Sequence, residues 1–512
     1  MAPKITVNGR RVGEYGGYDA LVYQDGGTVT AENRHGATIS SSDDAATVLQ
    51  AAITPGGTVL VDAGEYVLEA TQTPDFSFAY SVCLIVPPSK TTRLIGAGSG
   101  ATTLKLADGQ NAVDRGALMI MATGQKAGGV YGPTYDGLEI AGMTLDGNKA
   151  NQTLGPIWID GSGLILTGGK RAGTVYDRYG LHLHDLELKN SQAAAVYCGN
   201  NSGGVENFAL LDHLYVHDCG ARAIEIDFTD HVTARNILTH NNGEDYASAA
   251  FTGIIAHNNP ATLGARTMAD RLVLENVTTY DRLYLKNLQR PVVRGLYSDT
   301  TAITDAANVC GVNLYRCYEA VVEVDYVAAP TVGIWAHSYV PEGGSALTVP
   351  VAYIHNRGLI VAATPVKADY GAFVHLDGGE IRGIPDATCY GFYVDAAGNH
   401  CSNVYFGTDL DYLIAGGTGS TTLTGCRSAA ALPSSGTIVN CGGNVNFKLQ
   451  ATGTSTGTGS EQTIAHGLRA APTRVSVTPT ETGATVSAVW ADATNLHATV
   501  TSGKAYVWSA EV

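Results

Sequence analysis

The sequence predicts an all-β chain, built mainly as a right-handed parallel β-helix with a small β-sandwich-like module at its C-terminal end. Glycine accounts for 62 of the 512 residues and charged residues for only 15%, which favours strands and turns over helical bundles. Short apolar strand segments recur along the chain at similar spacings. One convincing helix precedes them, as a cap would.

An N-terminal arm is expected over residues 1–30, where short alternating segments are separated by glycine. The segment SSDDAATVLQAAI then predicts an amphipathic helix with one apolar stripe. Ser41 or Ser42 can cap this helix, and Asp43 and Asp44 suit the positive end of its dipole. A proline followed by two glycines ends it.

The body of the chain, residues 31–447, is predicted to be the β-helix. Segments such as AVYCG, AIEID, GIIAH, RLYLK, GVNLY and GIWAH recur along it. A period of about 20–30 residues, carried by short strands with Asn and Gly at the corners, is typical of a parallel solenoid. Stacking buries the apolar face that one rung cannot bury alone, and the helix covers the open edge.

The segment GGTVLVDAGEYVL at Gly56–Leu68, and the later GLEIAGMTLDGNKAN, resemble rungs of the pectate-lyase-like superfamily of parallel β-helix proteins. The resemblance covers residues 25–445. It implies a helix that caps the N-terminal end. Because the superfamily includes phage tailspikes, it also implies a homotrimer and an extracellular or virion-associated location. Lyases, hydrolases, epimerases and tailspikes share this fold, so the resemblance does not select one reaction.

The C-terminal end is expected to be separate from the β-helix. Residues 448–460 include TGTSTGTGS, whose composition predicts a flexible linker. Residues 461–512 then read as a C-terminal β module, which resembles small modules of phage tail fibres. Such a module could trimerise the chain, bind glycan or cap the β-helix.

Bulk properties exclude several classes of protein. The net charge of −16 argues against a nucleic-acid partner, whose phosphates favour clustered Lys and Arg. No stretch approaches the ~20 apolar residues of a membrane span. The nine cysteines contain no CxxC pair, and we interpret them as buried small residues rather than disulfides. The alternative disulfides are Cys310/Cys317, Cys389/Cys401 and Cys426/Cys441.

One outward face carries the most information about function. Alternate residues of a strand point to opposite sides, and the inward set is apolar throughout. The outward set mixes aromatic rings with acids and imidazoles, which suits sugar rings and their hydroxyls. The predicted polysaccharide-binding residues are Tyr197, His257, Tyr284, Lys286, Tyr315, Trp335 and His337. We expect this face to continue through Phe373–Asp377, although loops could bury some of its aromatic rings.

Within this face, Glu225 and Asp227 are the predicted catalytic pair. Residues i and i+2 of a strand point the same way with Cα atoms roughly 6.5–7 Å apart. Inverting glycosidases separate their two carboxyl groups by about 6.5–9.5 Å. Asp230 follows in the adjoining turn and could replace either acid. The segment EIDFTDH loosely resembles the acids of polygalacturonases and tailspike endoglycosidases, without the NTD and GHG motifs. A structural salt bridge is the alternative role.

These residues favour an endo-acting glycoside hydrolase. A polysaccharide lyase acting by β-elimination is the first alternative, with Lys286, Tyr284, His257 and His337 supplying its chemistry. The acidic net charge and the few Arg and Lys residues on this face count against a lyase. A non-catalytic glycan-binding tailspike or adhesin is the second alternative.

Two histidine pairs suggest a metal more weakly. His182 and His184 in LHLHD, like His213 and His217 in HLYVHD, have the spacing of one strand face and could bind a metal. Nothing else in the sequence completes such a site. No metal and no cofactor is therefore predicted.

Overall fold

The computed structural model describes residues 6–7, 10–11, 17–73, 80–88, 90–111, 116–122, 126–127, 130–131, 137–153, 163–167, 180–199, 206–227, 229–243, 252–257, 269–270, 272–303, 309–338, 351–385, 387–395, 398–415, 420–429, 437–440, 444, 450–465, 468, 471–492 and 494–511. The chain divides into two compact units, Met1–Ala306 with Gly311–Ala320, and Ala307–Cys310 with Val321–Val512. Parallel strands stack rung upon rung within each unit, which confirms the predicted right-handed parallel β-helix. No helix among these residues is long and apolar enough to cross a membrane.

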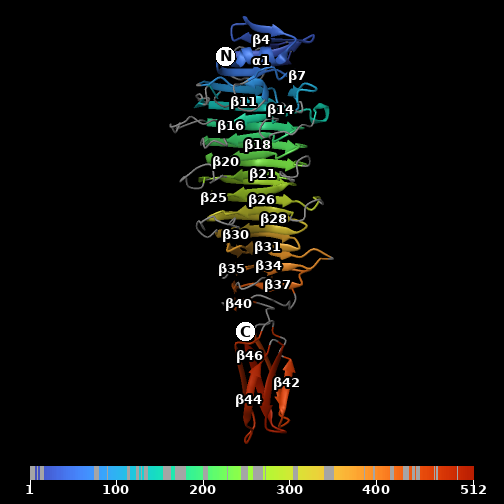
Figure 1. Ribbon diagram of the computed structural model, residues 1–512, viewed down its shortest axis with the longest axis vertical. Coiled ribbons are helices and arrows are strands. Elements are labelled where there is room, and N and C mark those ends of the chain that lie inside the picture. Colours follow the sequence, from blue (N-terminus) through green and yellow to red (C-terminus); the bar gives the residue numbers. More distant parts are fainter. Residues whose placement is uncertain are drawn as a thin grey trace. The chain divides into compact units, whose positions relative to one another are not determined.

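The first unit begins with a capped end (Figure 1). Helix α1 (Ala45–Ile53) buries one apolar stripe. Its N-cap is Asp44, which accepts a 2.9 Å hydrogen bond from the Ala46 N–H, so the prediction of Ser41 or Ser42 is wrong. The antiparallel strands β3 (Ala20–Asp25), β4 (Thr28–Asn33) and β5 (Thr38–Ser42) also belong to this end. The expected arm over 1–30 therefore ends before Ala20, because β3 pairs with β6 (Gly57–Val61) of the body.

Two parallel sheets form the rest of the first unit. The short-strand sheet consists of β8 (Tyr80–Ile85), β11 (Gly116–Ala122), β15 (Ile165–Thr167), β17 (Val196–Gly199), β19 (Ile224–Asp227), β21 (Thr252–His257), β24 (Arg282–Lys286) and β27 (Cys310–Tyr315). The long-strand sheet contains β6, β7 (Gly64–Leu68), β9 (Thr91–Gly96), β10 (Thr102–Leu106), β14 (Gly137–Asp146), β16 (Gly180–Lys189), β18 (Glu206–His217), β20 (Thr229–His240), β23 (Val273–Thr279) and β26 (Val292–Asp299).

The long strands bend at one shared position. Six residues in register there have φ between 50° and 64°: Gly142, Asp185, His213, Asn236, Asn276 and Gly295. Gly, Asn and Asp tolerate this left-handed conformation best. Buried Leu183 and Leu186 flank one such residue, so the alternation of inward and outward side chains skips a position at the bend.

The core runs between the sheets, and its composition matches the predicted inward set. Ile224, Ile226, Ile254 and Leu283 are at most 3% exposed. All eight cysteines among the described residues are buried and form no disulfide, as the interpretation of buried small residues predicted. Cys441 lies outside these residues.

The second unit continues with rungs of the same kind. One parallel sheet consists of β29 (Val332–His337), β31 (Thr364–Asp369), β34 (Tyr390–Val394) and β37 (Tyr412–Ala415). The other includes β30 (Val351–Val361), β32 (Phe373–Asp377), β33 (Glu380–Arg382), β35 (Asn399–Ser402), β36 (Tyr405–Phe406), β38 (Ser420–Thr424), β39 (Arg427–Ser428) and β40 (Thr437–Asn440). Phe373–Asp377 thus lie on a different sheet from Trp335, and β31 occupies the place expected for them.

The C-terminal module is a small sandwich of two antiparallel sheets. One contains β41 (Gln450–Thr456), β43 (Arg474–Pro479) and β46 (Ala505–Glu511), and the other β42 (Glu461–Ala465), β44 (Val486–Ala491) and β45 (Asn495–Val500). Leu496, Val500 and Tyr506 lie in its core. The flexible linker expected over 448–460 is wrong from Gln450 onward, because β41 pairs with β46 along its whole length.

The remaining elements are short or stand apart from these sheets. They are β1 (Thr6–Val7), β2 (Arg10–Arg11), β12 (Lys126–Ala127), β13 (Val130–Tyr131), η1 (Lys149–Asn151), β22 (Ala269–Asp270) and β25 (Leu288–Gln289). Strand β28 (Ala320–Ala328), in contrast, pairs with β30 in the same sheet.

Candidate functional site

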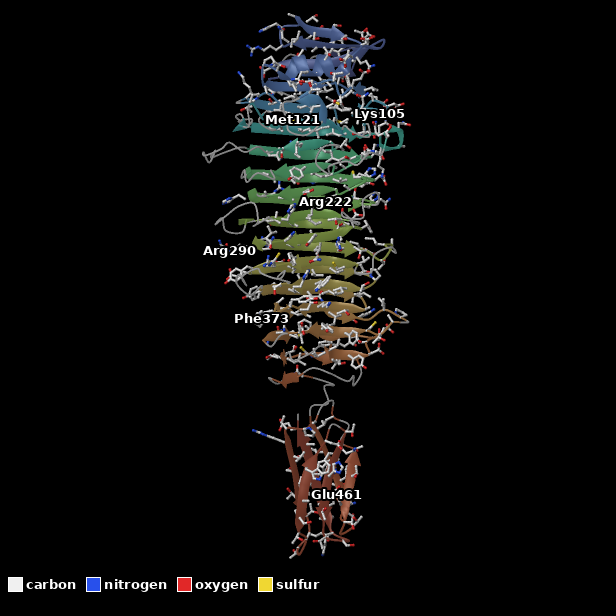
Figure 2. All side chains as sticks on the ribbon, viewed as in Figure 1. Lys105, Met121, Arg222, Arg290, Phe373 and Glu461 are labelled. Atoms are coloured by element: carbon white, nitrogen blue, oxygen red, sulfur yellow. The ribbon has the colours of Figure 1, made fainter. Side chains whose placement is uncertain are left out.

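Glu225 is the central residue of a buried ionic cluster on the short-strand sheet. Its side chain is 4% exposed and forms an ion pair with Arg222, which lies in the turn before β19 and is labelled in Figure 2. On the next strand, His257 Nε2 lies 2.7 Å from Glu225 Oε1. The side chains of Arg222 and His257 are each 16% exposed. Glu225 is therefore enclosed by its two partners.

The charge of Glu225 follows from these contacts. Burial raises the pKa of its carboxyl, but the hydrogen bond from His257 and the charge of Arg222 outweigh burial and lower the pKa below its usual range. Glu225 is thus an ionised acceptor at neutral pH. Such a carboxylate is suited to hold His257 and is poorly suited to donate a proton.

Asp227, His257, Lys286 and Tyr315 lie in register on four consecutive strands. Neighbouring strands of a sheet are about 4.7–4.9 Å apart. The four titratable residues therefore form a row across the sheet, one residue per rung and one strand spacing apart. The sequence predicted this row from strand alternation. Tyr284 lies in the parallel row that begins at Glu225.

Cations accompany the aromatic rings of these two rows. Arg282 Cζ lies 5.8 Å from the centre of the Tyr284 ring, and Lys286 Nζ lies 5.8 Å from the centre of the Tyr315 ring. Arg282, Tyr284 and Lys286 alternate with buried leucines on β24. The expected scarcity of basic residues on this face is therefore wrong locally, even though the net charge is negative.

The two other predicted acids are known only by their backbones. Asp227 ends β19, beside Gly199 and His257. Asp230 lies in β20 of the long-strand sheet, beside Asn207, and not in a turn next to Glu225. The side chains of both acids lie outside the described residues.

Tyr197 is not an exposed platform for sugar. It is 4% exposed and belongs to an apolar cluster with Val82, Leu118, Met121 and Leu166. Its outward position was predicted correctly, but the face is covered at this level. The polar part of the short-strand sheet therefore begins one strand later, at β19.

A second cluster lies in the second unit, around Trp335. The Trp335 Nε1–H donates a 2.9 Å hydrogen bond to Asp369, and Lys367 Nζ lies 2.8 Å from the same carboxylate. Lys367 Nζ also lies 4.6 Å from the centre of the Trp335 ring and 5.5 Å from that of Tyr393. Strand β31 brings both polar residues to Trp335. They were missed because no rung-like segment was recognised at Thr364–Asp369.

His337 stacks on the Trp335 ring with centroids 4.3 Å apart. Burial lowers the pKa of His337 to about 4. The imidazole is therefore neutral at physiological pH and provides a flat, uncharged surface beside the tryptophan.

One group among the described residues has the composition of a metal site. Glu139, His182 and His184 each offer a ligand atom, and these atoms lie within 4.8 Å of one another. The sequence indicated the two histidines but not Glu139, which lies on the preceding long strand.

Comparisons with known proteins give only distant likenesses. The sequence matches no protein-family model and no curated protein. Among solved structures, the A-module of mannuronan C-5 epimerase AlgE6 from Azotobacter vinelandii is 17% identical, with a TM-score of 0.49 over 78% of this chain and 95% of that one. The Streptococcus pneumoniae adhesin PfbA is 13% identical, with a TM-score of 0.37 over 78% and 93%. The tailspike gp49 of Pseudomonas phage LKA1 is 12% identical, with a TM-score of 0.38 over 91% and 92%.

Proposed function

We propose that this chain is a polysaccharide-degrading enzyme whose active face is formed by β19, β21, β24 and β27. The observation that carries the proposal is the 2.7 Å contact between Glu225 and His257. His257 itself lies in register with Lys286 and Tyr315. Aromatic rings can stack on sugar faces, while imidazole, ammonium and phenol groups can move protons and bind carboxylates.

The contacts of Glu225 favour elimination over hydrolysis. A hydrolase would use a carboxylic acid as proton donor, but Glu225 is ionised and enclosed. In an elimination, a base removes the proton from the carbon beside a uronic acid carboxylate. A C=C double bond then forms as the bond between the next ring carbon and the glycosidic oxygen breaks, and the departing oxygen takes up a proton from water. The products are an unsaturated uronate and a new reducing end.

We assign the roles from the positions of the side chains. Glu225 accepts the Nε2–H of His257, so the tautomer places the basic lone pair on Nδ1, and His257 acts as the base. Lys286, with Arg282, neutralises the carboxylate of the substrate. Tyr284 and Tyr315 stack on sugar rings. Glu225 is a positioning residue in this scheme.

Hydrolysis is the second candidate, because Asp227 follows Glu225 at the i+2 position of β19. Asp227 would then be the acid. Asp230 is only three residues later but lies in β20 of the other sheet, so we do not assign it as the first partner of Asp227. In the second unit, Trp335 and His337 with Lys367 would bind glycan in either case. An extracellular or virion-associated location and a homotrimer belong to the same proposal.

The test incubates the full chain with a panel of neutral and uronate-containing polysaccharides. Reducing ends and the ultraviolet absorbance of unsaturated uronates are followed together. We expect both signals to rise, and His257→Ala to lower the rate by about 10²–10⁴-fold. His217→Ala, on the long-strand sheet, is the control that keeps full activity.

Each other outcome selects an alternative. Reducing ends without the absorbance, lost in Asp227→Asn, would identify a hydrolase and overturn the elimination. Glycan binding with neither signal would identify a non-catalytic adhesin. For Glu225→Gln, a positioning role predicts a shifted pH profile of kcat/KM as well as a lower rate.

A further inference from the structure

A third cluster of chemically active side chains lies on the long-strand sheet, before its bend. His182 and His184 are two residues apart on β16, so their side chains leave the same face. Their rings stack with centroids 4.1 Å apart. Glu139 on β14 is the register partner of His182. The sheet therefore brings two imidazoles and one carboxylate together, although 43 residues separate Glu139 from His182.

His184 is oriented as a metal-binding histidine is. Its Nδ1 lies 2.8 Å from Asp185 Oδ2, and its Nε2 lies 3.2 Å from Glu139 Oε1. A carboxylate on one ring nitrogen fixes the tautomer and leaves the other nitrogen as the donor to a metal. Asp185 occupies the left-handed position of the bend, and this conformation directs it back to its neighbour.

The charges and the exposure suit a cation. Glu139 forms an ion pair with Arg93 and lies 3.2 Å from His184 Nε2, so its carboxylate is already placed to bind a cation. The side chains of Glu139 and His184 are 19% and 23% exposed, so an ion can reach them from solvent. Arg93 is 47% exposed and can move away from Glu139.

We propose that Glu139, His182 and His184 bind a divalent transition metal ion, with Zn²⁺ as the best match. Two imidazoles and one carboxylate are a common zinc ligand set, and three protein ligands leave a coordination position open for water or substrate oxygen. Binding displaces one Arg93 N–H from Glu139. The site lies on the long-strand sheet and does not depend on the function proposed for the short-strand sheet.

The chain contains a matched comparison. His217 Nε2 lies 3.2 Å from Glu187 Oε1, and His217 Nδ1 lies 2.5 Å from Asp218 Oδ2. This repeats the contacts of His184 one strand later. The residue two positions earlier, however, is Tyr215 instead of a histidine. His217 thus has acidic partners at the equivalent positions, without a second imidazole on its own strand.

The experiment titrates Zn²⁺ by calorimetry, and Co²⁺ by visible absorption, into the chelator-treated full chain. We expect one ion per chain and a Co²⁺ spectrum of low coordination number. His182→Ala, His184→Ala and Glu139→Gln should each weaken binding at least about 10-fold, and Asp185→Asn about 10–100-fold. His217→Ala should bind as the unmodified chain does, with circular dichroism confirming that every variant is folded.

Two results would overturn the proposal. One is the absence of saturable binding by the unmodified chain at micromolar Zn²⁺. The other is binding that survives in the folded His182→Ala/His184→Ala double variant, or that His217→Ala weakens equally. Unlike a structural role, metal ligation also predicts that the Co²⁺ absorption disappears with either histidine.

Discussion

Two clusters of the first unit contain the same three residue types in different surroundings. On the short-strand sheet, Glu225 is paired with Arg222 and His257. On the long-strand sheet, Glu139 is paired with Arg93 and His184. The side chain of Glu225 is 4% exposed and that of Glu139 is 19% exposed.

Burial decides whether a glutamate paired with an arginine and a histidine positions these side chains or binds an ion. An enclosed carboxylate costs stability if a partner is removed, so Glu225 fixes the position of His257 and Arg222. A carboxylate that water still reaches can exchange its partner for an ion, so Glu139 can act as a ligand. Exposure, rather than residue type, distinguishes the positioning residue from the binding residue.

The largest expected effect is on stability. Glu225→Ala leaves Arg222 buried without its partner, and we expect it to lower the free energy of unfolding by about 3–5 kcal/mol. Glu139→Ala, at the more exposed cluster, should cost less than about 1 kcal/mol. Urea unfolding of the full chain followed by circular dichroism measures both. Equal losses would remove the distinction between the clusters.

The second-largest expected effect is the loss of stability at low pH, which follows from the lowered pKa of Glu225. Because the pKa is lower in the folded chain than its usual value of about 4.5, the stabilisation is complete above that value. It is lost as the pH falls through the folded pKa. Between neutral pH and about pH 3, the Tm of the unmodified chain should therefore fall more than that of Glu225→Gln. Parallel curves for the two proteins would contradict this prediction.

The smallest effect concerns Arg93. Since it is half exposed, Arg93→Gln should change the free energy of unfolding by less than about 1 kcal/mol. Because Zn²⁺ carries two charges, removing a positive charge about 4 Å from it in water is worth about 2 kcal/mol, so Zn²⁺ affinity should rise about 30-fold. Calorimetry of this variant beside the unmodified chain gives the value. A loss of affinity would mean that Arg93 supports the site instead of competing for it.

Strand alternation predicted the β-helix and its apolar interior, because each rung repeats the same local pattern. It also placed His257, Tyr284, Lys286 and Tyr315 on one face. It could not tell that Tyr197 is covered, since burial at that level depends on contacts far along the chain. The same limit applies to Glu139, whose meeting with His182 depends on the length of the intervening segment. Composition predicted a flexible linker at residues 450–456, but these residues form a strand because they pair with β46.

The left-handed bend shared by the long strands has a consequence for how such a chain can change length. Asn236 and Asn276 occupy the same place on neighbouring rungs, so a single residue deleted within either strand would shift the later side chains of that strand to the wrong face. A deletion in the connecting loops leaves this alignment intact. The bend therefore fixes the register of each rung. A chain of this design can be lengthened or shortened by whole rungs, provided that each insertion or deletion runs from one bend to the equivalent bend of another rung.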